Sequence, residues 1–100
     1  MPEICLTLLC PREIEEKVLD LLLLAPEVEL FTSAPTAAHG MHVRNMSAKE
    51  QVLGRAHMVQ VHAFVLAKDR EILLSAIKQE FAGTGLRYWV ASLIEAGEIA

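Results

Sequence analysis

Imidazole and thioether side chains gather in one short stretch of the chain. The stretch contains His39, Gly40, Met41, His42 and Met46. Imidazole nitrogen suits zinc, nickel and copper ions, and a thioether sulfur adds a preference for copper. Because glycine lets the chain turn sharply, His39 and His42 can converge on one cation, and His57 lies near enough to join them. The alternative interpretation is a loop whose histidines and methionines face solvent or a protein partner.

Basic side chains suited to an anion or a nucleotide lie in the same part of the chain and near its C-terminus. They are Arg44, Lys49, Arg55 and Arg87. A guanidinium group can donate two parallel hydrogen bonds to a phosphate group, which makes the arginines the stronger candidates. The alternative interpretation is ordinary surface charge.

Nucleophiles and general bases give little support to an enzymatic function. No serine sits in a nucleophile elbow with histidine and aspartate partners. Cys5 lies inside a predicted strand and Cys10 at its end, and an extended chain places them about 16 Å apart, too far for a disulfide. We interpret Cys5 as a small buried hydrophobe and Cys10 as a residue at a helix start. His62 shares a strand face with Phe64, which favours a partly buried histidine with satisfied nitrogens over a metal ligand.

The elements that position these residues follow from hydrophobic spacing and from proline and glycine. Short apolar or alternating segments predict strands at about 3–9, 28–32, 57–66 and 86–94. Apolar residues at three- and four-residue spacing predict helices at about 11–24 and 69–81, with Pro11 in the first turn, Pro26 as a stop and Asp69 as an N-cap. Residues 33–54 show no sustained period beyond a capping box at Ser47 and Glu50. A connection of that length in a small domain is usually functional.

The predicted order of elements is βαββαβ, which defines an α+β, ferredoxin-like fold with a four-stranded antiparallel sheet and two helices on one face. The first and last strands carry apolar residues on both faces. The sheet face without helices is therefore expected to be buried as well, most simply by other copies of the chain. The whole chain, 1–100, is expected to form one domain.

The overall composition excludes several classes of protein. The 100 residues are 53% hydrophobic and carry a net charge of −4, without a basic stripe. Nucleic-acid binding is therefore not expected. Apolar runs such as Leu21–Ala25 are far shorter than the roughly 20 residues that span a bilayer. Glu3 lies where a signal peptide would carry positive charge, and we expect a soluble, cytoplasmic protein.

These features resemble the PII-like (GlnB/GlnK-type) superfamily of nitrogen regulatory proteins over nearly the whole chain. The resemblance rests on the apolar first strand, the Leu-rich helix, Thr32-Ser33-Ala34, Gln51-Val52-Leu53-Gly54-Arg55, and the segment from Gly85-Leu86-Arg87-Tyr88-Trp89-Val90 to Glu95-Ala96-Gly97-Glu98. Three motifs more narrowly resemble a branch of short PII-like proteins often encoded beside heavy-metal efflux pumps, namely Cys5-Leu6-Thr7-Leu8-Leu9-Cys10-Pro11, Glu50-Gln51-Val52-Leu53-Gly54-Arg55 and Arg87-Tyr88-Trp89-Val90.

The resemblance implies a homotrimer that is a non-enzymatic regulator, sensing a small ligand and binding a protein partner, such as a membrane transporter or efflux protein. Residues 33–55 would match the T-loop, and its base would form an intersubunit cleft for adenine nucleotide with Gly83, Thr84 and Arg87. The chain departs from the PII pattern in its short turn Ala82–Gly85, which has no lysine, and in a loop without tyrosine. The alternative is a CutA-like protein of the same trimeric fold that binds copper, zinc or nickel.

Overall fold

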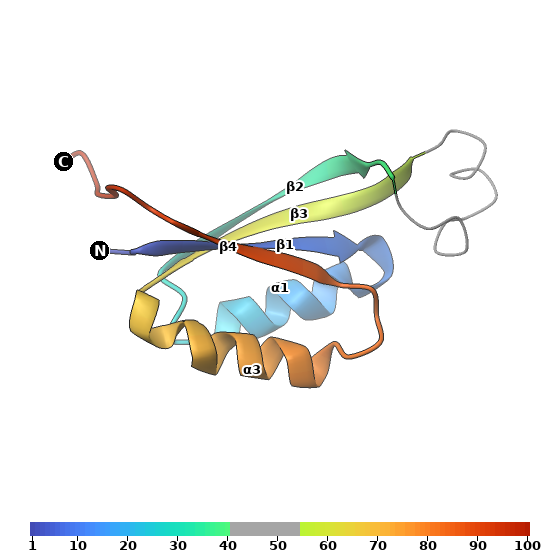
Figure 1. Ribbon diagram of the computed structural model, residues 1–100, viewed down its shortest axis with the longest axis horizontal. Coiled ribbons are helices and arrows are strands. Elements are labelled where there is room, and N and C mark those ends of the chain that lie inside the picture. Colours follow the sequence, from blue (N-terminus) through green and yellow to red (C-terminus); the bar gives the residue numbers. More distant parts are fainter. Residues whose placement is uncertain (41–54) are drawn as a thin grey trace.

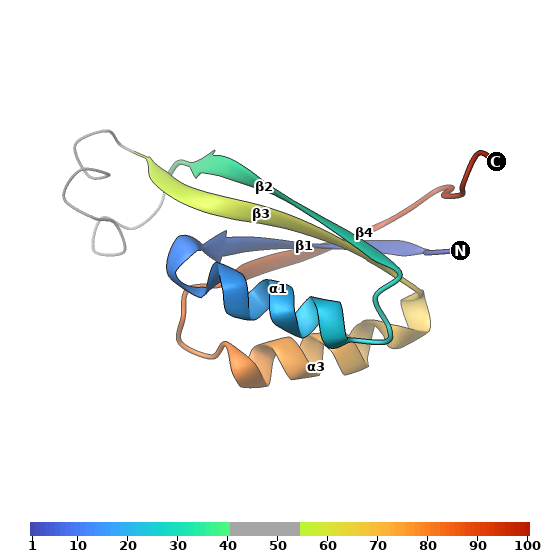
Figure 2. The same ribbon diagram turned by 180° about the vertical axis from the view of Figure 1, so that it is seen from behind.

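The computed structural model describes residues 1–40 and 55–100 and has four strands and two α-helices in the order βαββαβ. The elements are β1 (Ile4–Pro11), a 3-10 turn (Arg12–Ile14), α1 (Glu15–Leu24), β2 (Leu30–Ala38), β3 (Ala56–Val65), a second 3-10 turn (Ala67–Asp69), α3 (Arg70–Glu80) and β4 (Arg87–Ser92). The strands form one antiparallel sheet in the order β2-β3-β1-β4, and both helices lie on the same face (Figures 1 and 2). The predicted α+β, ferredoxin-like fold is confirmed.

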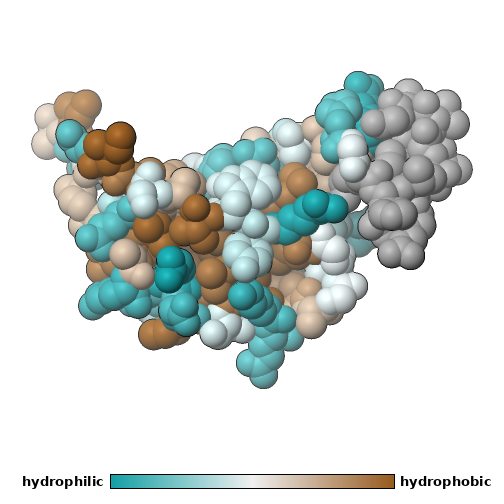
Figure 3. Space-filling view, in the orientation of Figure 1, coloured by the Kyte–Doolittle hydropathy of each residue, from teal (hydrophilic) through white to brown (hydrophobic). Residues whose placement is uncertain are grey.

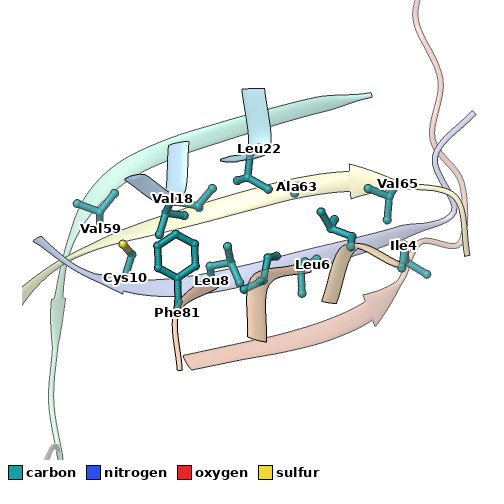
Figure 4. Close-up of a cluster of buried hydrophobic side chains, with 13 residues drawn as sticks. Ile4, Leu6, Leu8, Cys10, Val18, Leu22, Val59, Ala63, Val65 and Phe81 are labelled. Atoms are coloured by element: carbon teal, nitrogen blue, oxygen red, sulfur yellow. The ribbon is translucent and has the colours of Figure 1, made fainter. Parts of the chain in front are cut away.

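The core lies between this sheet and the two helices. Strand β1 places every second residue on the helix side, so that Leu6, Leu8 and Cys10 are almost completely buried. The helices contribute residues at i and i+4, of which Val18 and Leu22 come from α1. Figure 4 shows these side chains meeting Val59, Ala63, Val65 and Phe81 in one apolar layer. Burial of these stripes holds the helices on the sheet, because an isolated helix of ten residues is marginal in water.

The start of the first helix differs from the prediction. Pro11 does not begin the helix; it is the last residue of β1, pairs with Met58 and has an extended backbone, with φ −57° and ψ 140°. The pairing of β1 with β4 ends earlier, at Leu9 and Arg87, so that Pro11 lies beyond that ladder on one side. A residue without an N–H group is tolerated there. The α-helix itself begins only at Glu15, after the 3-10 turn.

Strand β2 is longer than predicted and lies further along the chain. It begins at Leu30 rather than at 28 and continues through Ala38, so residues 33–38 belong to the sheet and not to the loop. The segment has weak strand propensity, but β3 offers it a paired partner from Phe64 to Ala56. Pro35 fits because β2 is an edge strand. The connection that remains between the two strands runs from 39 to 55.

The face of the sheet without helices carries both apolar and polar side chains. The strand register places Leu30, Phe64, Cys5 and Ala91 in one row across it, and Thr32, His62, Thr7 and Trp89 in the next. Leu30 is 60% exposed and Trp89 is 47% exposed. We call this surface the open face. In the view of Figure 3, hydrophobic residues reach the molecular surface between hydrophilic ones. Among the described residues, no helix is long and apolar enough to cross a membrane.

Candidate functional site: a cleft at the base of the β2–β3 connection

A cleft of about 460 Å³ lies where β1 ends and where β3 and β4 begin. Its walls include Pro11, Met58, His57 and Arg87, together with the turn at residues 83–85. The antiparallel ladder explains this meeting, because β3 starts beside the end of β1 and β4 starts on its other side. The cleft therefore lies next to the end of the β2–β3 connection, whose last residue precedes Ala56.

The turn between α3 and β4 is shaped by two glycines and one threonine. Gly83 has φ +77° and Gly85 has φ +85°, a left-handed backbone that other residues rarely adopt. The Thr84 hydroxyl donates a 2.7 Å hydrogen bond to the carbonyl of Phe81 and accepts a longer one, 3.4 Å, from the Leu86 N–H. The proton of that hydroxyl is thus already used. Thr84 therefore fixes the shape of the cleft wall rather than offering a free donor.

The charges that line the cleft nearly balance. Arg87 supplies a cation on the sheet side, and Glu13, from the 3-10 turn after β1, supplies a carboxylate. Pro11 and Leu86, both partly exposed, add apolar surface that suits a flat ring. A mixed lining of this kind fits a ligand with one anionic group and an apolar body.

The structure brings together four of the residues predicted to bind a ligand or a metal. Gly83, Thr84 and Arg87, from the nucleotide set, line the same cleft as His57, from the metal set. Arg55 is exposed directly before Ala56, which also lines the cleft. Five further residues of the two predicted sets lie outside the described residues, namely Met41, His42, Arg44, Met46 and Lys49, as does the predicted capping box at Ser47 and Glu50.

Two members of the predicted metal set lie at neighbouring strand ends. His39 is exposed and follows directly after Ala38, which pairs with Ala56 in β3. His57 is the next residue along β3. Within 1–40 and 55–100, no three His, Cys, Asp or Glu side chains are grouped closely enough to hold a metal ion.

Several residues of this region carried no signal in the sequence. Pro11 was predicted to lie in the first helical turn, and Glu13 was not singled out, yet both line the cleft. A smaller hollow of about 280 Å³ shares His57 and Met58 and adds Arg12, which sequence spacing did not single out. Their positions follow from the pairing of β1 with β3, a long-range contact that local patterns do not encode.

Neither cysteine has the role that the sequence predicted, a buried hydrophobe for Cys5 and a helix-start residue for Cys10. Cys10 is completely buried on the helix side of β1, whereas Cys5 is only partly buried on the open face. The reason is that β1 extends to Pro11, which carries the two-residue alternation through Cys10. Burial, assisted by the nearby Glu15 and Glu13 carboxylates, raises the pKa of the Cys10 thiol from 9.0 to about 11. Cys10 therefore stays a neutral thiol and is a poor nucleophile.

A small polar cluster lies within the open face. The Nδ1 atom of His62 lies 2.9 Å from the Thr7 hydroxyl and 3.6 Å from the Cys5 sulfur, and its Nε2 atom lies 3.1 Å from the Gln60 amide nitrogen. Thr7 is only 3% exposed. The prediction of a partly buried histidine with satisfied nitrogens is confirmed.

The architecture is that of the PII-like proteins. The nitrogen regulatory PII-like protein CPII from Thiomonas intermedia K12, in its complex with ADP, AMP and bicarbonate, has a TM-score of 0.73 at 19% identity, with 99% of this chain and 98% of that chain covered. A putative PII-like signalling protein from Thermus thermophilus has a TM-score of 0.66 at 12% identity, covering 93% of this chain and 88% of that chain. The resemblance to the PII-like superfamily is thereby confirmed at the level of the fold.

The sequence also identifies a family that is narrower than the PII-like fold. Residues 1–100 match the family described as "Protein of unknown function (DUF3240)", and the chain belongs to it. A crystal structure of a DUF3240 family protein from Shewanella baltica OS155 has a TM-score of 0.81 at 16% identity, with 100% of this chain and 99% of that chain covered. No curated protein sequence matches the chain.

Proposed function

We propose that the chain is a non-enzymatic, PII-like regulatory protein whose cleft at the base of the β2–β3 connection binds an adenine nucleotide. The observation that carries the proposal is the meeting of Arg87, His57 and the turn at 83–85 in one cleft. CPII, which has the same fold, was captured with ADP and AMP. Ligand binding at the base of the connection would then be relayed to a protein partner through residues 39–55.

The size and charge of the cleft favour a ligand with few phosphates. A volume of about 460 Å³ falls in the range of small-molecule sites. Arg87 can donate a forked pair of hydrogen bonds to one phosphate group, while Glu13 opposes further negative charge. Pro11 and Leu86 provide apolar surface for the base. AMP and ADP are therefore the expected ligands among the adenine nucleotides. The protein is expected to bind them in the cytoplasm.

Calorimetric titration with AMP, ADP and ATP tests the nucleotide site. Removal of a charge-assisted hydrogen bond costs about 1.5–3 kcal/mol, so Arg87→Ala is expected to weaken ADP binding by about tenfold or more. Arg70→Ala is the matched control, because Arg70 is an exposed arginine on α3 that pairs with Glu71 and does not line the cleft. If the unaltered protein does not bind the nucleotides, or if both substitutions weaken binding equally, the cleft is not a nucleotide site.

We further propose that three copies assemble through their open faces. The rows that contain Leu30, Phe64 and Trp89 leave apolar surface on this face, and apolar surface of this kind usually marks an interface. Light scattering during size exclusion is expected to give three times the chain mass of 11.1 kDa. Trp89→Lys should reduce that mass, whereas Leu23→Lys, on the exposed side of α1, should not. A monomeric unaltered protein would contradict the trimer.

Cation binding by His39, Met41, His42, Met46 and His57 stays a prediction. The same calorimeter can titrate Zn(II), Ni(II) and Cu(I) into the protein. If the double substitution His39→Ala and His42→Ala leaves cation binding unchanged, this CutA-like alternative is wrong.

A further inference from the structure

A groove of about 640 Å³ runs between the two helices. The helices lie side by side in both Figure 1 and Figure 2. The apolar part of the lining comes from the end of α1 and the start of α3 and includes Leu21, Leu24, Ala25, Ile72, Leu73 and Ala76. Leu24 is 82% exposed and Ile72 is 60% exposed. Helix surfaces normally place charged residues at such positions, so two aliphatic side chains beside one groove indicate a contact surface.

The charged side chains around the groove are mostly acidic. Asp20, Glu27 and Glu80 line it, against a single cation, Lys17. Within the part of the chain that the structure describes, the salt bridge joins Arg70 to Glu71, and none involves these three carboxylates. The groove therefore combines an apolar lining with a rim that carries a net negative charge.

We propose that this groove binds an amphipathic helix of a partner protein, with leucine-like side chains entering the groove and lysine or arginine residues facing the rim. A helix that lies in a groove presents apolar residues at i, i+3, i+4 and i+7, which suits an elongated site bounded by two helices. The carboxylates Asp20, Glu27 and Glu80 select for basic flanks through charge complementarity.

The same charges disfavour a second copy of this chain as the occupant. Two copies facing each other through this groove would bring the acidic rims together, and like charges at an interface are unfavourable. The groove also lies on the helix side of the sheet, away from the open face. A partner seated here would leave both the open face and the nucleotide cleft accessible.

A fluorescently labelled peptide provides the direct test. The probe carries leucines at i, i+3, i+4 and i+7 with lysines at both ends, and a matched probe carries glutamates in place of the lysines. The fluorescence anisotropy of the lysine probe is expected to rise and saturate as protein is added, with a dissociation constant on the order of 100 µM or lower. Much weaker binding is expected for the glutamate probe. No saturable binding of the lysine probe, or equal binding of both probes, would overturn the proposal.

Adjacent leucines at the end of α1 give a matched pair of variants. Leu24 lines the groove, whereas Leu23 is similarly exposed, at 72%, and does not line it. Leu24→Ser is expected to weaken binding of the lysine probe by about tenfold, because it removes the apolar contact of one leucine. Leu23→Ser should change the affinity less than about twofold. Equal effects of the two substitutions would refute the assignment of the groove.

Charge variants and the mass of the assembly complete the test. Asp20→Asn combined with Glu80→Gln is expected to reduce the preference for the lysine probe over the glutamate probe. An unchanged preference would contradict the role of the rim. If Leu24→Ser instead lowers the assembly mass in light scattering, the groove is an interface between copies of this chain and the proposal is wrong.

Discussion

The buried thiol of Cys10 gives the protein a stability that depends on pH in a defined window. Its pKa rises from 9.0 to about 11 on folding, chiefly because burial disfavours the thiolate. Between pH 9 and 11 the unfolded chain therefore loses the Cys10 proton while the folded chain keeps it. The free energy of unfolding contributed by this group is fully present below pH 9 and falls as pH rises toward 11.

The magnitude follows from the size of the shift. A shift of this size corresponds to about 3 kcal/mol in the limit of high pH, of which about 2 kcal/mol is lost between pH 9 and 11 because each thiol titrates gradually around its pKa. Replacement of Cys10 with alanine removes this titration but leaves a small cavity among buried side chains, at a cost of about 1 kcal/mol that does not depend on pH. The unaltered protein is therefore expected to be more stable than Cys10→Ala at pH 8 and less stable at pH 11.

Urea denaturation at pH 8, 9, 10 and 11, at one fixed protein concentration, measures this crossing. The fixed concentration matters because assembly also contributes to apparent stability. Other groups titrate in both proteins alike, so the difference between the two free energies isolates Cys10. Cys5→Ala is the control, because it removes the other thiol of β1 and keeps Cys10, and it should retain the steep loss. If the curves of the unaltered protein and Cys10→Ala stay parallel, the burial argument is wrong.

Three further substitutions probe packing and hydrogen bonding by the same denaturation assay. Leu8→Ala removes a completely buried side chain and should cost about 2–5 kcal/mol, whereas Leu24→Ala, at 82% exposure, should cost less than about 0.5 kcal/mol; similar costs would refute the assignment of the core. Thr7→Val should cost about 1–2 kcal/mol by depriving His62 of its 2.9 Å partner, and much less in a His62→Phe background. Thr84→Val should lower the free energy of unfolding by about 1 kcal/mol, because the 2.7 Å hydrogen bond to Phe81 is lost. An unchanged free energy of unfolding would show that the turn does not depend on this bond.

Local patterns in the chain were enough to predict the elements and their order. The alternation in 57–66 identified the buried face of β3 correctly, because side chains on a strand point to opposite faces in turn. The i, i+4 spacing of Leu73 and Ile77 likewise identified α3 and the face that it buries. Asp69 precedes α3 as predicted, but its side chain forms no capping hydrogen bond, since a 3-10 turn leads into the helix.

The candidate site was predictable only in part. Glycines at 83 and 85 marked a tight turn from the sequence, and Arg87 was singled out as the cation beside it. Their meeting with Glu13 and His57 was not predictable in the same way, because Glu13 and His57 come from separate elements that long-range pairing brings together. The helix groove at Leu24 also carried no signal, since it requires the relative position of two helices.

The sequence by itself determined the fold class of this protein, because hydrophobic period and turn residues act over a few neighbouring positions. Tertiary structure decided where the strands end and what their ends form. Pairing with β3 extended β2 across Pro35 to Ala38, and pairing of β1 with β3 kept Pro11 in the sheet. Cross-strand hydrogen bonds outweighed weak local propensity at both places. The extension of β1 to Pro11 buried Cys10 and formed one wall of the cleft at the base of the β2–β3 connection.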